Sequence, residues 1–190
     1  AQAGLTFGEN QYDLDRYQKI RDLSVDILHE YTDMDHNKIR DLFASETGYQ
    51  TPKIDIRAAV FKEGKILLVN EKIDGKWSLP GGWADVNSSA SESAKRECFE
   101  EAGAVVKPKR IIAIHLANRH NNNNLPFTIY KIFVECELIE YRFAKNTETL
   151  ASDFFSPDSL PELSTERNTS EQINMCFDAR NSKSFETIFD

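Results

Sequence analysis

Residues 81–104 read GGWADVNSSASESAKRECFEEAGA and place three carboxylates close together on one predicted helix. A helix turns once in 3.6 residues, so Glu97 and Glu101 stack on one face and Glu100 lies beside them. Like charges at this spacing repel one another, so we expect a cation there. Oxygen ligands of this kind suit Mg²⁺ or Mn²⁺ and leave coordination positions open for water and for substrate phosphates.

The ends of this helix are also encoded locally. Residues 89–92 (SASE) fit the S-x-x-E capping box, and Gly103 follows where a left-handed residue ends a helix, which predicts a helix from about Ala90 to Ala102. Arg96 lies four residues before Glu100, close enough to pair with it and hold it still. Small residues recur every four positions on another face, which is expected to pack on a sheet. They are Ala90, Ala94, Cys98 and Ala102.

Composition indicates a globular chain and argues against some partners. The 190 residues, 40% of them hydrophobic and 11% aromatic, suit one medium domain with a small appendage. A net charge of −8 and the lack of clustered Lys and Arg argue against nucleic acid as a partner. The short basic run Lys107–Arg110 is interpreted as the entry to a strand. No apolar run approaches the ~20 residues that span a bilayer, and no charged-then-apolar leader is seen, so no membrane partner is expected.

The cysteines and histidines predict no zinc site. Cys98, Cys136 and Cys176 are dispersed, odd in number and set among apolar residues, which indicates reduced core thiols in a cytoplasmic protein. No C-x-x-C occurs, and the four histidines lack metal-ligand spacing.

The first fifty residues predict helices. Residues 12–31 show a broad apolar face at helical spacing, and residues 35–47 form a second predicted helix closed by Gly48. A hairpin of ~40 residues is too small to be stable alone, so it packs either on the rest of the chain or on another copy. Of these two uses we expect dimerisation, with residues 1–50 forming the main contact of a homodimer. Pro52 marks the boundary.

Residues 51–190 alternate between strand and helix patterns. Four segments rich in β-branched and aromatic residues are predicted strands, the first two joined by a hairpin turn at Glu63-Gly64. They are residues 54–61, 65–70, 110–116 and 128–138, and a last helix is predicted at about 170–179. Strands on both sides of one central helix predict an α/β architecture.

At this point the residues resemble a known family. Trp77-Ser78-Leu79-Pro80-Gly81-Gly82, followed by Arg96-Glu97-Cys98-x-Glu100-Glu101-x-Gly103-Ala104, is similar to the Nudix box and the W-x-L-P-G-G entry to it. That box is the signature of hydrolases of nucleoside diphosphates linked to another moiety. Ser88 departs from the pattern, which has Glu at that position. The resemblance covers about residues 53–190 and implies an α/β/α sandwich with a mixed sheet.

The resemblance also implies roles for individual residues. It implies that Glu97, Glu100 and Glu101, with the carbonyl of Gly81, hold Mg²⁺ or Mn²⁺. Glu148 lies in a segment similar to one that carries a distal acid, which serves as a further metal ligand or as a general base. The alternative for Glu148 is an ordinary loop carboxylate.

Two arginines are candidates for binding substrate. Arg57, on the strand beside the box, is placed to neutralise a diphosphate, although a lone strand arginine is as often the exposed partner of an acid. Arg119 lies with His120 in the polar stretch 118–124, which is read either as a mobile loop or as a substrate-recognition loop.

The expected reaction is metal-dependent hydrolysis to a nucleoside monophosphate and a phosphorylated second group. The N-terminal hairpin resembles the extension of a Nudix subgroup that acts on nucleoside diphosphates linked to choline or ribose, so CDP-choline is expected first and ADP-ribose second. The rivals are an RNA-processing Nudix enzyme, a mutagenic-nucleotide triphosphatase and a catalytically silent nucleotide sensor. The acidic charge argues against the first and the helical extension against the second. Only Ser88 favours the third, and the intact glutamate set argues against it.

Overall fold

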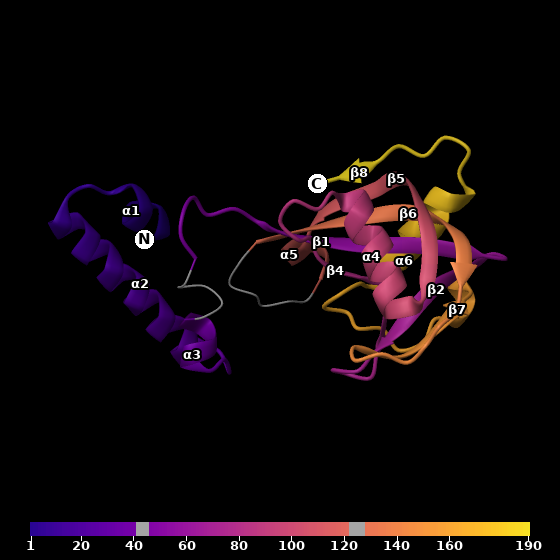
Figure 1. The fold of residues 1–190 in the computed structure, drawn as a ribbon, viewed down its shortest axis with the longest axis horizontal. Helices are drawn as coiled ribbons and strands as arrows, with labels where there is room; N and C mark the ends of the chain where they lie inside the picture. The colour runs from indigo at the N-terminus through magenta and orange to yellow at the C-terminus, as the bar shows by residue number, and fades with distance from the viewer. Residues whose placement is uncertain (41–45, 122–127) are drawn as a thin grey trace. The chain divides into compact units, whose positions relative to one another are not determined.

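The computed structural model of the chain describes residues 1–40, 46–121 and 128–190, which form two compact units. One unit spans Ala1–Thr51 and the other Pro52–Asp190. The described part of the first is helical, whereas the second is built on a sheet with helices packed against it (Figure 1). None of the described helices has the length and apolar character needed to cross a membrane.

Two of the described helices of the first unit begin at polar caps. The described helices are α1 (Gln2–Phe7), α2 (Gln11–Tyr31) and α3 (His36–Ile39). The side chain of Asn10 accepts a hydrogen bond at the start of α2, and that of Asp35 does so at the start of α3. The helix predicted over 12–31 is confirmed by α2. The helix predicted over 35–47 starts as expected, but its predicted end is wrong, because residues 46 and 47 are not helical; residues 41–45 lie outside the described residues. The six-residue α1 was not predicted because it is too short to show an apolar period and has no side-chain cap.

One face of α2 is apolar and exposed within the single chain. Its large apolar side chains stand three or four residues apart, which places them on one side of the helix. Val25 of the same helix is buried, so α2 also has an inner face. The exposed set, called here the α2 stripe, consists of Ile20, Leu23, Ile27 and Tyr31.

The second unit is one mixed sheet with helices on it. Its described strands are β1 (Lys53–Lys62), β2 (Lys65–Glu71), β3 (Trp77–Ser78), β4 (Gly81–Trp83), β5 (Ala104–Leu116), β6 (Ile129–Tyr141), β7 (Thr149–Phe155) and β8 (Ile188–Phe189). Its described helices are α4 (Ala90–Ala102), α5 (Ala117–His120) and α6 (Ser170–Asn181), with a 3₁₀ turn, η2 (Pro157–Ser159). The α/β architecture with a mixed sheet is therefore as predicted.

Strand β1 is at the centre of the sheet. The strand order is β3-β2-β1-β6-β5-β8, with β4 paired to β1 and β7 to β2. β1 runs parallel to β6 and antiparallel to β2 and β4. Glu63 and Gly64 both have positive φ at the β1–β2 turn, which confirms the predicted hairpin. Because β4 and β6 lie on either side of β1, these three strands, which are distant in the sequence, are neighbours in the sheet.

Each face of the sheet has its own apolar core. Val60 of β1 packs in one cluster with Ala94 and Cys98 of α4, whereas its neighbour Ala59 packs in the other with Ile173 of α6. This alternation follows from the two-residue period of a strand. Figure 1 shows α4 and α6 on opposite sides of the sheet, so the predicted α/β/α layering is confirmed.

One sequence interpretation of this unit was wrong, and another was wrong for its first residues. Strand β5 begins at Ala104, not Arg110, so the basic run Lys107–Arg110 lies inside a strand. Shifts in the pairing of β5 with β6, one of them between Pro108 and Arg110, accommodate the proline. The polar stretch 118–124 begins as the short helix α5, and residues 122–127 lie outside the described residues.

Candidate active site

Helix α4 starts and ends at the predicted residues. The backbone N–H of Glu92 donates to the side chain of Ser89 and the N–H of Ser89 donates to the side chain of Glu92, while Gly103 ends the helix at φ 62°. Ala94, Cys98 and Ala102 are fully buried against the sheet. This packing fixes the rotation of the helix and hence where its glutamates stand.

Two of the three glutamates are buried beside strand β4. Glu97 is 7% exposed and Glu101 is 5% exposed, whereas Glu100 is exposed. The backbone N–H of Gly81 donates to Oε2 of Glu101 over 2.8 Å. Gly81 has φ 151°, and a Cβ atom there would lie 1.9 Å from the carbonyl oxygen of Ile56. Glycine is therefore required at position 81 for the backbone N–H to reach Glu101.

Arg96 links the glutamates on the outer side of α4. Its guanidinium lies 3.3 Å from Glu100, as the spacing predicted, and also 2.9 Å from Glu97 and 3.1 Å from Asp85. The contact with Glu97 was not predicted. Because one cation faces three carboxylates, the cluster keeps a net negative charge.

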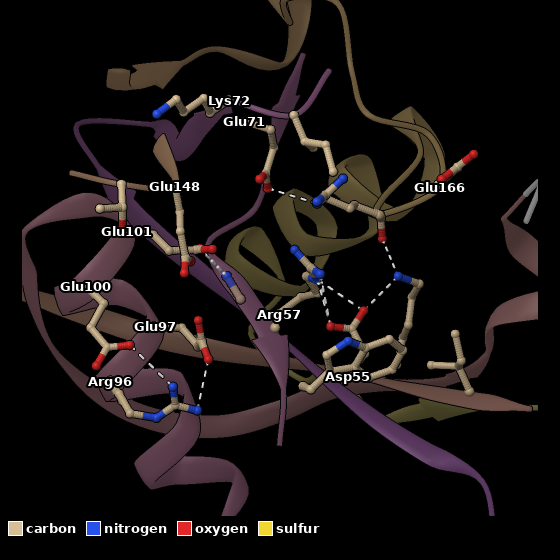
Figure 2. Close-up of a pocket in the computed structure, with 18 residues that line it drawn as sticks. Asp55, Arg57, Glu71, Lys72, Arg96, Glu97, Glu100, Glu101, Glu148 and Glu166 are labelled. Atoms are coloured by element: carbon tan, nitrogen blue, oxygen red, sulfur yellow. Dashed lines mark hydrogen bonds and ion pairs between the residues drawn. The ribbon is translucent and has the colours of Figure 1, made fainter. Parts of the chain in front are cut away.

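The glutamates of α4 line a pocket of about 840 Å³ within the second unit. Figure 2 shows Glu97, Glu100, Glu101 and Glu148 on one side of it and Arg57 with Asp55 on the other. The lining residues are Asp55, Arg57, Glu71, Lys72, Ile73, Gly81, Gly82, Trp83, Arg96, Glu97, Glu100, Glu101, Ile129, Lys131, Thr147, Glu148, Glu166 and Arg167.

Buried charges on β1 and β6 form the side of the pocket opposite the glutamates. Asp55 is paired with Lys131 in the register of the two strands, and its Oδ2 accepts a 2.7 Å hydrogen bond from Lys131 Nζ. Arg57 approaches the same carboxylate at 3.0 Å and donates to the carbonyl of Leu79. Burial by itself raises the pKa of Asp55, but Arg57 and Lys131 outweigh it and hold that pKa below its usual value. Two cations thus surround one anion, which leaves net positive charge.

A second ion pair, between buried Glu71 and half-buried Arg167, lines the pocket near α6. Oε1 of Glu71 accepts from the hydroxyl of Ser78 at 2.5 Å and lies 3.0 Å from Nε of Arg167. The carbonyl of Arg167 in turn accepts from Lys131 Nζ at 2.6 Å. The segment before α6 is therefore fixed to β2 and β6 at once.

Glu148 is held near the glutamates of α4 by Asn146. The side-chain amide of Asn146 donates to the carbonyls of Glu100 and Glu101, and its oxygen accepts from the backbone N–H of Glu148. Figure 2 shows the carboxylate of Glu148 directed toward Glu101, whereas Glu166 points away from the glutamates. Of these two acids, Glu148 is thus the one that faces the glutamates of α4.

The burial of two carboxylates on one helical turn changes how they ionise. Burial raises the pKa of Glu101 to about 8, although Arg57 and the amide of Gly81 act in the opposite direction. Burial also raises the pKa of Glu97, against the charge of Arg96, and Glu100 and Glu148 add to the rise. A positive charge in the pocket would favour the ionised forms of both.

The oxygen atoms of the predicted ligands suit a hard divalent cation, although the described side chains are not close enough together to form a complete metal site. In residues 1–40, 46–121 and 128–190, no three Asp, Glu, His or Cys side chains stand close enough together to hold an ion. Glu97, Glu100, Glu101 and Gly81, the predicted ligands, all line one pocket and offer only oxygen atoms. Such a set suits Mg²⁺ or Mn²⁺ and not Zn²⁺, which prefers nitrogen and sulfur.

Comparison with known families agrees with this geometry. The model of the NUDIX domain matches residues 51–174, more than half of the chain. The chain belongs to the Nudix family. The family model described as "UDP-X-like, N-terminal oligomerisation domain" matches residues 1–43. The protein is thus a Nudix hydrolase preceded by helices of an oligomerisation type, and Nudix hydrolases typically use divalent metals.

Several Nudix relatives match most of the chain. One relative is the Bacillus subtilis (strain 168) protein named "Putative ADP-ribose pyrophosphatase YjhB", to which the chain is 41% identical. The match covers all 190 residues of this chain and 91% of the relative. A crystal structure of an ADP-ribose pyrophosphatase from Streptococcus suis 89-1591 is 46% identical and covers 74% of this chain and 100% of that one, with a TM-score of 0.69. A crystal structure of a UDP-X diphosphatase is 31% identical. The match covers 97% of this chain and 90% of that one, also with a TM-score of 0.69.

Some of the predicted site residues of this Nudix protein lie in the pocket and others do not. Arg57, Arg96 and Glu148 line it together with the four predicted metal ligands. Arg119 is not among the lining residues and lies 3.9 Å from Asp190. Ser88, which replaces a Glu of the Nudix pattern, also lies outside the lining set, and its hydroxyl is 3.1 Å from that of Ser93.

The Nudix pocket also contains charged residues that the sequence analysis did not select. Asp55 and Lys131 interrupt apolar strand segments, which was a visible signal, but their pairing depends on a parallel register between distant strands. Glu71 stands at the end of a strand and Arg167 in an irregular segment, so neither shows a periodic pattern. Asn146 carried no signal in the sequence.

Proposed function

We propose that this Nudix hydrolase cleaves the diphosphate of a nucleoside diphosphate linked to another moiety, with ADP-ribose or a UDP-linked compound ahead of CDP-choline. The names of the relatives support this order, since they include ADP-ribose pyrophosphatases and a UDP-X diphosphatase. None of the relatives reported above is named for CDP-choline, the substrate expected first from sequence.

The observation that carries the proposal is the opposition of charges across one pocket. Buried carboxylates, Glu97 and Glu101, lie on one side, and buried cations, Arg57 and Lys131, lie on the other. A diphosphate with a divalent cation has the complementary arrangement, since its oxygens meet the basic side and the cation meets the acidic side.

In the proposed reaction, water attacks one phosphorus and the bond between that phosphorus and the bridging oxygen breaks. One product is a nucleoside monophosphate and the other is the phosphorylated second group. A divalent ion held by Glu97, Glu100, Glu101 and the Gly81 carbonyl would stabilise charge on the phosphoryl oxygens and acidify water. Glu148 accepts the proton of the attacking water on its carboxylate, and Arg57 neutralises the diphosphate. Arg96 holds Glu97 and Glu100 in position.

Incubation with a panel of substrates tests this proposal. The purified chain is incubated with ADP-ribose, a UDP-sugar or CDP-choline in Mg²⁺, and release of the monophosphate is followed by chromatography. Glu97→Gln and Glu101→Gln are each expected to lower kcat by orders of magnitude, because each removes a carboxylate from the acidic side. Glu140→Gln is the matched control, an exposed glutamate outside the pocket. Undiminished turnover in both pocket variants would contradict the assignment.

We also infer that residues 1–50 form the main contact of a homodimer. The match of residues 1–43 to a family of oligomerisation domains supports this, as does the exposed α2 stripe. A second copy of the chain provides a complementary apolar surface without any further partner.

A further inference from the structure

Trp83 is a large aromatic side chain at the pocket that the reaction above does not use. It lines the pocket and remains 51% exposed. Among the described lining residues it is the one aromatic side chain. A ligand that covers the exposed part of this indole would bury apolar surface, which is favourable. A flat binding surface in a polar pocket is therefore a feature to explain.

The register of the sheet places Trp83 close to the reacting groups. Trp83 lies opposite Asp55 in the pairing of β4 with β1, and Asp55 lies opposite Lys131 in the pairing of β1 with β6. Residues opposite one another in a sheet point to the same face, so the indole, the carboxylate and the ammonium form one row. Trp83 also stands two residues after Gly81, or about 6.6 Å along the strand.

That separation matches the length of a nucleotide. The group bound beside Gly81 and Glu101 is the diphosphate in the proposed function, and a ribose joins it to a planar base roughly two strand residues away. We propose that Trp83 stacks on the nucleobase of the substrate and so sets the affinity for the nucleoside half. This inference rests on the proposed function only in assuming that the ligand is a nucleotide.

The charges of the row favour a base over a cationic group. The alternative ligand for an indole is a quaternary ammonium such as choline, which proteins usually enclose in a cage of several aromatic side chains. Here one indole lines the same pocket as Arg57 and Lys131, whose two positive charges exceed the single negative charge of Asp55. A second cation is repelled there, whereas a neutral base accepts stacking from any aromatic face.

Tryptophan fluorescence tests the inference without hydrolysis. The chain has two tryptophans, and Trp77→Phe leaves Trp83 as the sole indole while keeping an aromatic ring against Phe155. The variant is titrated in chelator with AMP, UMP, ribose 5-phosphate or phosphocholine. We expect saturable quenching by the monophosphates that carry a base and none by ribose 5-phosphate. Equal quenching by ribose 5-phosphate, or quenching by phosphocholine alone, would overturn the inference.

Kinetics provide the second readout. Trp83→Ala is expected to raise KM about 10-fold or more with kcat changed less than about 3-fold, because stacking acts on binding and not on the phosphorus. Trp83→Phe should recover most of the affinity. Val86→Ala is the control, an exposed apolar residue outside the pocket. Unchanged KM in Trp83→Ala would refute the stacking role while leaving the hydrolase assignment intact. Base-dependent quenching in a chain that hydrolyses nothing in the panel would support stacking and refute only the proposed reaction.

Discussion

At the scale of single residues, Glu101 links the ionisation of the site to the stability of the fold. Its pKa is about 8 in the folded chain without metal, against an ordinary value near 4.5. Between these pH values the folded chain holds a proton that the unfolded chain has lost, so stability present below about pH 4.5 is lost as pH rises toward 8. In chelator we expect the free energy of unfolding to fall over this window, by at most about 5 kcal/mol at 1.36 kcal/mol per pKa unit.

Urea unfolding at several pH values between 4.5 and 8 measures this effect. Glu101→Gln should flatten the profile, because an amide does not titrate. Glu140→Gln, an exposed glutamate outside the pocket, should leave the slope as it is in the parent chain. A profile that Glu101→Gln does not alter would show that another group is responsible.

Gly81 provides a prediction about sterics at the same scale. A Cβ atom there meets the carbonyl oxygen of Ile56 at 1.9 Å, so Gly81→Ala forces β4 away from β1. We expect a loss of about 3 kcal/mol or more in the free energy of unfolding. Gly64→Ala is the matched control, because Gly64 also has positive φ but no atom lies within 4 Å of its Cβ position. Its cost should be only about 1 kcal/mol, and equal losses in denaturant melts would exclude the steric explanation.

At the scale of elements, the parallel pairing of β1 with β6 places a buried ion pair in the sheet. Asp55 is 3% exposed and touches both Lys131 and Arg57. Asp55→Ala leaves two buried cations without their counterion and should cost about 3–5 kcal/mol. Glu140→Ala removes an exposed partner of Arg142 and should cost less than about 1 kcal/mol. Similar losses in thermal and denaturant unfolding would show that the buried pair contributes no more than a surface pair.

Elements were predictable where their signals are local. The capping box and Gly103 delimit α4 to the residue, and the i, i+3, i+4 spacing gave its three glutamates. Strand β5 was predicted too short because Pro108 and the basic residues around it obscure a strand that tolerates them through shifted pairing. Asp55, Lys131 and Arg167 were missed because their contacts depend on long-range register, which a single sequence does not contain.

At the scale of the whole molecule, we expect the proposed homodimer to depend on the α2 stripe. Leu23→Glu places a charge in the middle of this stripe and should shift the chain toward monomer in light scattering, because a dimer would bury that charge. Gln18→Glu adds the same charge to the same helix at an exposed position outside the stripe and should leave the mass unchanged. If Leu23→Glu keeps the mass of the parent, the contact lies elsewhere.

The parallel pairing also determines when the pocket can form as the chain folds. Asp55 and Lys131 lie 76 residues apart, so the pairing of β6 with β1 closes a long loop that includes α4. Contacts between such distant residues form slowly, since closing a long loop costs entropy before any pairing compensates. A nascent chain that ends before Lys131 already contains the four predicted metal ligands and Arg57, yet it lacks Lys131 and the rest of β6 beside β1. Binding competence therefore appears only when synthesis has passed β6, however early α4 becomes helical.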